Sequence, residues 1–195
     1  ADLTREEEVQ AVVTDARTAL GGLDAVVNCA GIYATGKRLE DVTDAEWDRT
    51  IAVNLTAIFR VCRATLPLLR AAGGGSVVNI ASVHAIATVT GVPAYAASKA
   101  GVVGLSRQMA LDYAVDRIRV NSVIVGSVAT RMTLDGLEEA GGAEALGLSF
   151  ADNRIARIAN PREIATAIGF LISDAASFVT GSNFVADGGM LARLM

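Results

Sequence analysis

Tyr95 and Lys99 are four residues apart in the stretch YAASK, so on a helix their side chains lie on one face about one turn apart. A tyrosine hydroxyl has a pKa near 10 and exchanges protons poorly at neutral pH, but an adjacent ammonium group stabilises the phenolate and lowers that pKa. Reaching a pKa near 7 requires about 4 kcal/mol, so further positive charge nearby would help. Taken alone, the pair is more typical of an exposed helix surface than of a catalytic acid–base.

Ser82 strengthens the catalytic interpretation. It follows an apolar segment, residues 76–81, and precedes Tyr95 by 13 residues, so a crossover between them can bring its hydroxyl back to the tyrosine. A hydroxyl at that place can hold a carbonyl oxygen or a developing alkoxide. The three side chains together predict proton transfer at a carbonyl or hydroxyl group.

Helices and buried strands alternate along the chain. Helical periodicity covers residues 4–20, 43–72, 94–114 and 160–171, and capping boxes are predicted at Thr4–Glu7 and Thr43–Glu46. Short apolar runs at residues 25–27, 76–81, 118–125 and 183–186 predict strands. This alternation predicts one α/β domain over residues 1–195, a three-layer, doubly wound parallel sheet.

Polar or glycine-rich segments follow three of the predicted strands directly, at residues 28–31, 82–84 and 126–130. The carboxyl ends of parallel strands meet at one edge of the sheet, where such folds bind ligands. We therefore expect these segments to converge. Residues 131–159 mix glycines with large apolar side chains, which is typical either of a mobile flap covering a substrate or of an ordinary pair of surface helices.

Composition excludes several classes of protein. The chain has 195 residues, 52% hydrophobic and 19% charged, and its net charge of −4 without a basic cluster argues against nucleic acid. Cys29, Cys62 and the single His84 do not have metal-ligand spacing, so no metal site is predicted. No apolar run of about 20 residues suggests a membrane span, and the acidic start does not resemble a signal peptide. These features favour a protein of the reducing cytoplasm.

The ordered set of motifs resembles the short-chain dehydrogenase/reductase family of the standard-length type. VVNCAGI resembles the family's Asn-Asn-Ala-Gly turn, IAVNLTAIF carries its active-site asparagine, and NIASVHA carries its serine. YAASK, RVNSVIVGSVAT and FVTGSNFVADGG follow in the family's order. The likeness extends over essentially the whole chain and is far more specific than any single motif.

The resemblance implies a Rossmann-like oxidoreductase that interconverts a secondary alcohol and a ketone with NAD or NADP. Tyr95 would be the acid–base, Lys99 would lower its pKa and bind the nicotinamide ribose, and Ser82 would orient the carbonyl. Asn54 would hold a water in the proton relay. The implied cofactor-binding residues are Asp2, Leu3, Asn28, Ala30, Gly31, Tyr95, Lys99, Val128 and Thr130.

Three positions depart from the family or stand apart from it. Cys29 replaces the second asparagine of the turn, as a tolerated small residue. Val125 precedes Gly126 where the family has proline, which frees a backbone N–H and predicts a looser or reshaped nicotinamide pocket. His84 lies two residues past Ser82, where side chains can line the substrate cleft, but a solvent-facing histidine is the more typical interpretation.

The family begins with a strand and a glycine-rich turn that bind the pyrophosphate, and neither is in this sequence. Asp2-Leu3 matches the end of the family's third strand, so we expect about two further βα units before Ala1. Without them the strand at residues 25–27 would be an exposed edge. The residue that distinguishes NAD from NADP would lie in that segment.

Three functions remain open. The first is the oxidoreductase, for which 3-oxoacyl-carrier-protein reduction is a common substrate class. The second is a non-catalytic homologue acting as a binding or scaffold protein. The third is a lyase or epimerase of the longer nucleotide-sugar branch, against which the compact carboxyl end argues. The resemblance also implies a homo-oligomer, a tetramer in which the helices at 43–72 and 94–114 pair across a two-fold axis.

Overall fold

A computed structural model describes residues 1–139, 141–153 and 155–192. The strands are β1 (Ala25–Asn28), β2 (Gly75–Ile80), β3 (Ile118–Val125) and β4 (Asn183–Ala186). The α-helices are α1 (Glu6–Leu20), α2 (Asp44–Ile51), α3 (Ala57–Ala71), α4 (Pro93–Asp112), α5 (Arg131–Glu139) and α6 (Pro161–Ile172). Short 3₁₀ segments join several of them.

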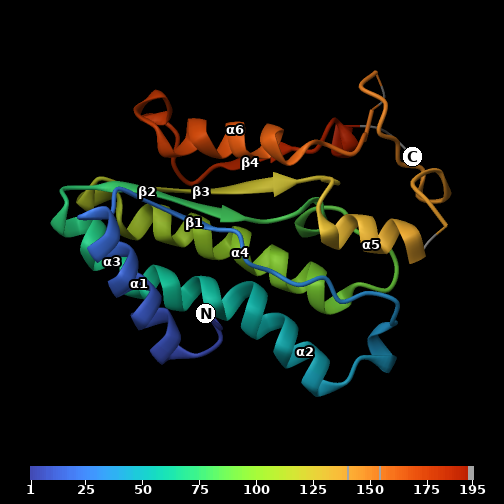
Figure 1. Cartoon of the computed structure of the whole chain (residues 1–195), viewed down its shortest axis with the longest axis horizontal. Coiled ribbons are helices and arrows are strands. Elements are labelled where there is room, and N and C mark those ends of the chain that lie inside the picture. The colour runs from blue at the N-terminus through green and yellow to red at the C-terminus, as the bar shows by residue number, and fades with distance from the viewer. Residues whose placement is uncertain (140, 154, 193–195) are drawn as a thin grey trace.

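The four strands form one parallel sheet in the order β1-β2-β3-β4. Helices α1 to α4 lie on one side of this sheet and α6 lies on the other (Figure 1). The three-layer α/β prediction is confirmed, because β1, β2 and β3 are each followed by a helix that crosses back over the sheet to the next strand.

The helix ends show which capping signals operate. Thr43 accepts a hydrogen bond from the Glu46 N–H and the Glu46 side chain accepts from the Thr43 N–H, as predicted. The box predicted at Thr4–Glu7 is wrong. Helix α1 begins only at Glu6, because the Thr4 N–H and hydroxyl both donate to the Asp2 carboxylate and Glu7 pairs with Arg5 instead. A nearer acceptor outcompetes the cap.

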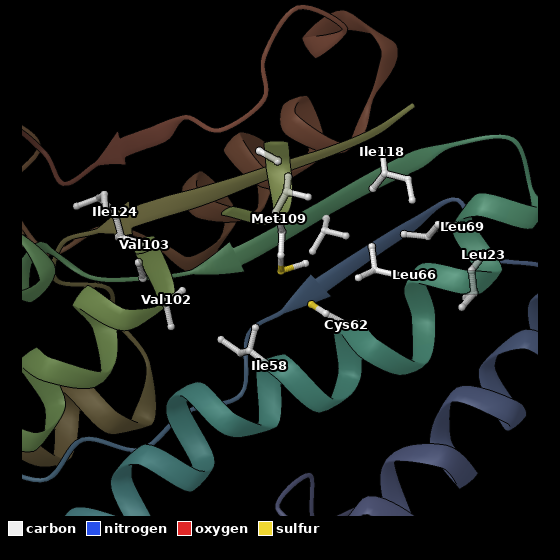
Figure 2. Packing of buried hydrophobic residues seen from close by; sticks show 14 of the residues in the cluster. Leu23, Ile58, Cys62, Leu66, Leu69, Val102, Val103, Met109, Ile118 and Ile124 are labelled. Atoms are coloured by element: carbon white, nitrogen blue, oxygen red, sulfur yellow. The ribbon is translucent and has the colours of Figure 1, made fainter. Parts of the chain in front are cut away.

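The main core lies between the sheet and helices α3 and α4 (Figure 2). Val77 and Val120 on the central strands are fully buried, and Leu66 and Val102 pack on them from the two helices. A second, smaller cluster lies under α6 on the other face of the sheet. Strands β2 and β3 are therefore buried on both faces, which is why adjacent apolar residues, such as Val77 with Val78 and Val123 with Ile124, occur in them in place of a strict apolar–polar alternation.

Strand β1 is an edge strand in the part of the chain that the structure describes. It pairs with β2, and Val27 is 40% exposed. Helix α1 packs mainly against α3 and extends past the edge of the sheet (Figure 1). The arrangement agrees with the expected exposed edge.

Helices α2 and α3 join through a π-helical turn, Ala52–Thr56, into one helix, Asp44–Ala71, that is long and apolar enough by length and composition to span a membrane. Its apolar residues Ile58, Cys62 and Leu66 lie in the main core, against the sheet. Arg60 and Arg63 on its outer side pair with Glu6 of α1. The segment is thus a core helix of the α/β domain.

Gly126, immediately after β3, makes the closest backbone approach to the last strand. A Cβ at this position would lie 2.8 Å from the Cα and 3.0 Å from the carbonyl oxygen of Asp187. Asp187 has little freedom to move, because its carboxylate accepts hydrogen bonds from the Gly189 and Leu191 N–H groups.

We therefore expect Gly126→Ala to lower the free energy of unfolding by about 1 to 3 kcal/mol, the usual effect of overpacking. Gly169→Ala is the matched control, because a Cβ at Gly169 in α6 meets nothing within 4 Å. This change should raise stability by about 0.5 to 1 kcal/mol. Urea denaturation of the two variants measures both effects, and equal stabilities would contradict the close contact.

Candidate active site

The segments after β1 and β2 converge beside helix α4. The Lys99 ammonium donates a hydrogen bond of 2.9 Å to the carbonyl of Ile80, the last residue of β2. The Asn54 side chain bonds to the backbone of Ile32, which follows the turn after β1. Two strand ends and two helices thus meet at the carboxyl edge of the sheet, as the sequence predicted.

Tyr95 lies near the start of α4, is only 9% exposed, and has Ser82 beside its hydroxyl. Burial raises the pKa of Tyr95 above its ordinary value of 10, and the neighbouring Ser82 hydroxyl acts in the opposite direction. Ser82 has extended backbone geometry at the end of the loop after β2, and its hydroxyl also accepts from the His84 N–H. The pair predicted from the sequence is therefore in contact.

Lys99 is 4% exposed, and its Nζ lies 5.7 Å from the centre of the Tyr95 ring. Burial lowers its pKa from 10.5 to about 8. The expected lowering of the Tyr95 pKa by Lys99 is not seen in this structure, where burial dominates both groups. The ammonium has three N–H donors, of which the Ile80 carbonyl takes one. The remaining donors suit hydroxyl groups such as those of a ribose.

Asn54 is fully buried in the π-helical turn between α2 and α3. Its Oδ1 accepts from the Ile32 N–H at 2.8 Å, and its Nδ2 donates to the Ile32 carbonyl at 2.9 Å and to Ser98 Oγ at 3.1 Å. Single π-turns in helices are frequent at functional sites. Here the turn directs an amide toward the loop after β1 and toward Ser98, one residue before Lys99, so Asn54 connects the catalytic helix with that loop.

Four of the residues expected to bind a dinucleotide line one pocket of about 240 Å³. They are Asp2, Leu3, Ala30 and Gly31, and Val53 and Ala57 complete its wall. A Cβ on Gly31 would lie 3.3 Å from Asn54 Oδ1 and 3.6 Å from Lys99 Nζ. Small residues here keep the backbone open beside the buried ammonium, as a bound ribose requires.

Asn28 faces away from this pocket. Its Nδ2 donates to Asn79 Oδ1 at 2.8 Å and to Cys62 Sγ at 3.3 Å, and Asn79 donates to Ser106 Oγ at 2.9 Å. This buried chain joins β1, β2 and α4. Because the Asn28 side chain is engaged in these hydrogen bonds, we expect its backbone to be the part that contacts a dinucleotide.

Val128 and Thr130 are held by backbone pairing after β3. Val128 pairs with Ala159, and the Thr130 N–H donates to the Val128 carbonyl. Val125 is the last residue of β3, pairs with Ala186 and is 9% exposed. Its expected effect on the nicotinamide pocket stays a prediction.

His84 is a second correction. It is half-buried, not solvent-facing, and its ring centre lies 5.5 Å from that of Tyr95. Tyr33 from the loop after β1 lies 4.7 Å from the same ring, edge to face. The sequence reasoning missed Tyr33, although its place just after the Asn-x-Ala-Gly turn is a usable signal.

Residues 131–159 hold α5 and a 3₁₀ turn, Glu144–Leu146, and residue 140 and residue 154 lie outside the described part. Several of their large apolar side chains are at least 44% exposed: Met132, Leu134, Leu146, Phe150 and Ile155. Such exposure suits the flap proposal.

The described residues contain no group of three His, Cys, Asp or Glu side chains that could hold a metal ion. Cys29 is exposed, whereas Cys62 is buried and its pKa is raised to about 12. Buried in this way, Cys62 is a core residue.

Comparison with known proteins agrees with this geometry. The family profile described as "Enoyl-(Acyl carrier protein) reductase" matches residues 1–191. The 2-(S)-hydroxypropyl-CoM dehydrogenase 3 of Xanthobacter autotrophicus is 39% identical over 98% of this chain and 75% of its own length. The cyclohexanol dehydrogenase of an Acinetobacter species is 37% identical over 99% and 74%. The crystal structure of levodione reductase superimposes with a TM-score of 0.91 at 34% identity, covering 100% of this chain and 76% of that one.

The chain therefore belongs to the short-chain dehydrogenase/reductase family. Two of the relatives named above are, by name, dehydrogenases of secondary alcohols.

Proposed function

We propose that this protein is an NAD(P)-dependent oxidoreductase that interconverts a secondary alcohol and a ketone. The observation that carries the proposal is the buried Tyr95 with Ser82 beside its hydroxyl and the Lys99 ammonium one helical turn away, 5.7 Å from the centre of the Tyr95 ring. That arrangement brings a proton-exchanging phenol, a hydroxyl donor and a cation together at one site. The relatives named as dehydrogenases support the same reaction.

Each side chain of the site has its own proposed role in the reaction. Ser82 donates to the substrate oxygen and holds it beside the Tyr95 hydroxyl. In alcohol oxidation Tyr95 takes the hydroxyl proton from that oxygen, and in ketone reduction it returns it. The Lys99 ammonium binds ribose hydroxyls with the N–H donors that the Ile80 carbonyl does not take. We propose that its charge also favours the phenolate, against the burial that raises the Tyr95 pKa. A bound nicotinamide supplies the other half of the reaction, the transfer of hydride to or from the carbinol carbon.

The chain's residues fit such a dinucleotide. The pocket at Asp2, Leu3, Ala30 and Gly31 opens beside Lys99, and the backbone there is free of bulky side chains. Val128 and Thr130 extend the same edge from β3. Since the residues that distinguish the 2′-phosphate are not among these, we propose NAD or NADP without preference.

The test uses the protein with each dinucleotide and a secondary alcohol. We expect fluorescence titration to show binding of NADH or NADPH, and absorbance to show reduction of the oxidised form when cyclohexanol or 2-propanol is added. Binding without turnover of either alcohol or of the corresponding ketones would contradict the oxidoreductase. Failure to bind both dinucleotides would favour the scaffold alternative.

Two further expectations belong to this proposal. The flap at residues 131–159 covers the substrate, and the enzyme is a cytoplasmic homotetramer in which the helix Asp44–Ala71 and α4 pair with a second copy. Exposed small residues along α4, Ala97, Ala100 and Gly104, permit close packing of such helices. Light scattering that reports only monomer at micromolar concentration would contradict the oligomer.

A further inference from the structure

An aromatic cluster surrounds the catalytic tyrosine. The ring centres of Tyr33 and Tyr95 are 4.7 Å apart with the planes at 89°, and those of His84 and Tyr95 are 5.5 Å apart at 81°. Tyr33 and His84 themselves are 5.9 Å apart. The chain has three tyrosines and one histidine, so two of the three tyrosines and the single histidine meet at this point.

The cluster is not part of the core. Neither Tyr33 nor His84 belongs to either hydrophobic cluster, and Tyr33 is 37% exposed. Both rings come from loops at the carboxyl edge of the sheet, Tyr33 after β1 and His84 after β2. Half-exposed rings that touch a buried catalytic side chain offer their free faces to whatever reaches that side chain.

Polar contacts fix the two rings at their outer ends. His84 Nδ1 lies 2.9 Å from Thr88 Oγ1, and the Tyr33 hydroxyl lies beside Thr35. The two loops are also joined, because the Lys37 N–H donates to the Gly91 carbonyl at 3.4 Å. Gly36 and Gly91, both with positive φ, allow this approach. The rings are therefore held in place before a substrate arrives.

The approach to Tyr95 is restricted by these contacts. Lys99 lies on one side of the ring, with the dinucleotide pocket beyond it at Gly31. Tyr33 and His84 occupy another side. A substrate that presents its oxygen to Tyr95 and Ser82 must then lay one substituent against these two rings. Burial lowers the pKa of His84, so at neutral pH its ring is uncharged and suits an apolar neighbour.

We propose that Tyr33 and His84 form an aromatic wall that determines substrate specificity, selecting secondary alcohols and ketones whose reacting carbon carries a ring or a similarly broad apolar group. The inference rests on the proposed oxidoreductase function and narrows its substrate class. A broad apolar substituent gains contact area with both rings, whereas a methyl group reaches little of them.

The test compares cyclohexanol with 2-propanol, which have the same reacting group and differ in the bulk beside it. We expect Tyr33→Leu and His84→Leu each to lower kcat/KM for cyclohexanol relative to 2-propanol by about tenfold or more, the scale of discrimination by an apolar pocket. Tyr33→Phe is the matched control. This variant keeps the ring and removes only the hydroxyl beside Thr35. The ratio of kcat/KM for cyclohexanol to kcat/KM for 2-propanol should therefore stay within about threefold of the wild-type ratio.

The possible outcomes distinguish failure of the aromatic-wall proposal from failure of the proposed oxidoreductase function. An equal fall with both alcohols, or no change with either, would overturn the wall and leave the oxidoreductase standing. If wild type oxidises neither alcohol, the proposed function fails. The wall is then judged by ligand-observed NMR with cyclohexanone and acetone, and equal binding of cyclohexanone to wild type and Tyr33→Leu would overturn it. Thermal melting confirms that each variant is folded.

Discussion

Tyr95→Phe is expected to lower kcat by about 10² to 10⁴-fold while leaving dinucleotide affinity within about twofold of wild type. Removing the hydroxyl removes the group that exchanges the substrate proton, and positioned general acid–base catalysis contributes on this scale. The ring itself remains, so its contacts with Tyr33 and His84 are preserved.

The stability of this variant should change little. The lost hydroxyl lies beside Ser82, whose own hydroxyl accepts a hydrogen bond from the His84 N–H. Steady-state kinetics with cyclohexanol and a titration with NADH and NADPH give the two quantities directly.

Tyr113→Phe serves as the control. Tyr113 follows α4, and its ring lies 5.9 Å from the Arg70 guanidinium, away from the sheet edge where the site lies. Loss of the Tyr113 hydroxyl should leave kcat unchanged. Turnover of Tyr95→Phe comparable to wild type would remove Tyr95 from the acid–base role, and a similar fall in Tyr113→Phe would point to a general effect on folding.

The strands and their order at the sheet edge could be predicted because their signals are local. Adjacent valine and isoleucine residues mark β2 and β3, which are buried on both faces, and the segments that follow the two strands carry the candidate site residues. The π-turn at Ala52–Thr56 could not be predicted, because it depends on where the Asn54 amide finds partners in Ile32 and Ser98, far away in sequence.

The corrected expectations have different causes. Thr4 has the residue type of a cap, but its N–H and hydroxyl donate to the carboxylate of Asp2, two residues away, so a local contact decides. His84 looks like a surface residue until Tyr33 is brought beside it from a loop about 50 residues earlier, so here a tertiary contact decides.

The second large effect concerns Lys99, whose burial opposes stability while its charge serves catalysis. Lowering its pKa from 10.5 to about 8 corresponds to about 3 kcal/mol by which the fold disfavours the ammonium at neutral pH. Lys99→Met removes this penalty, and methionine fills a similar volume. The substitution also leaves the Ile80 carbonyl without its hydrogen-bond donor, which lowers the free energy of unfolding by about 1 to 3 kcal/mol. We therefore expect a free energy of unfolding at pH 7 equal to wild type or up to about 2 kcal/mol higher, together with loss of turnover and weaker dinucleotide binding.

Measuring stability at several pH values separates the burial penalty on the Lys99 ammonium from the lost hydrogen bond to the Ile80 carbonyl. Between pH 8 and pH 10.5 the unfolded chain still holds a proton on Lys99 that the folded chain has released, so this group makes wild-type stability rise with pH across that window. Lys99→Met lacks the rise, whereas other titrating groups are common to both proteins and cancel in the difference. The stability of the variant relative to wild type should therefore fall by about 3 kcal/mol from pH 7 to pH 10.5 and end below zero, where only the lost contact with Ile80 remains.

Urea denaturation of both proteins at several pH values measures this difference. Lys37→Met is the control, since Lys37 is the other lysine of the chain, lies at the surface and pairs with Glu46 at 2.6 Å. Its difference from wild type should stay small, as for an exposed ion pair. A Lys99→Met difference that is constant over this pH range would show that the ammonium is not strained by burial. A reversal of sign with turnover lost would show that the fold gives up stability to keep a charge beside Tyr95.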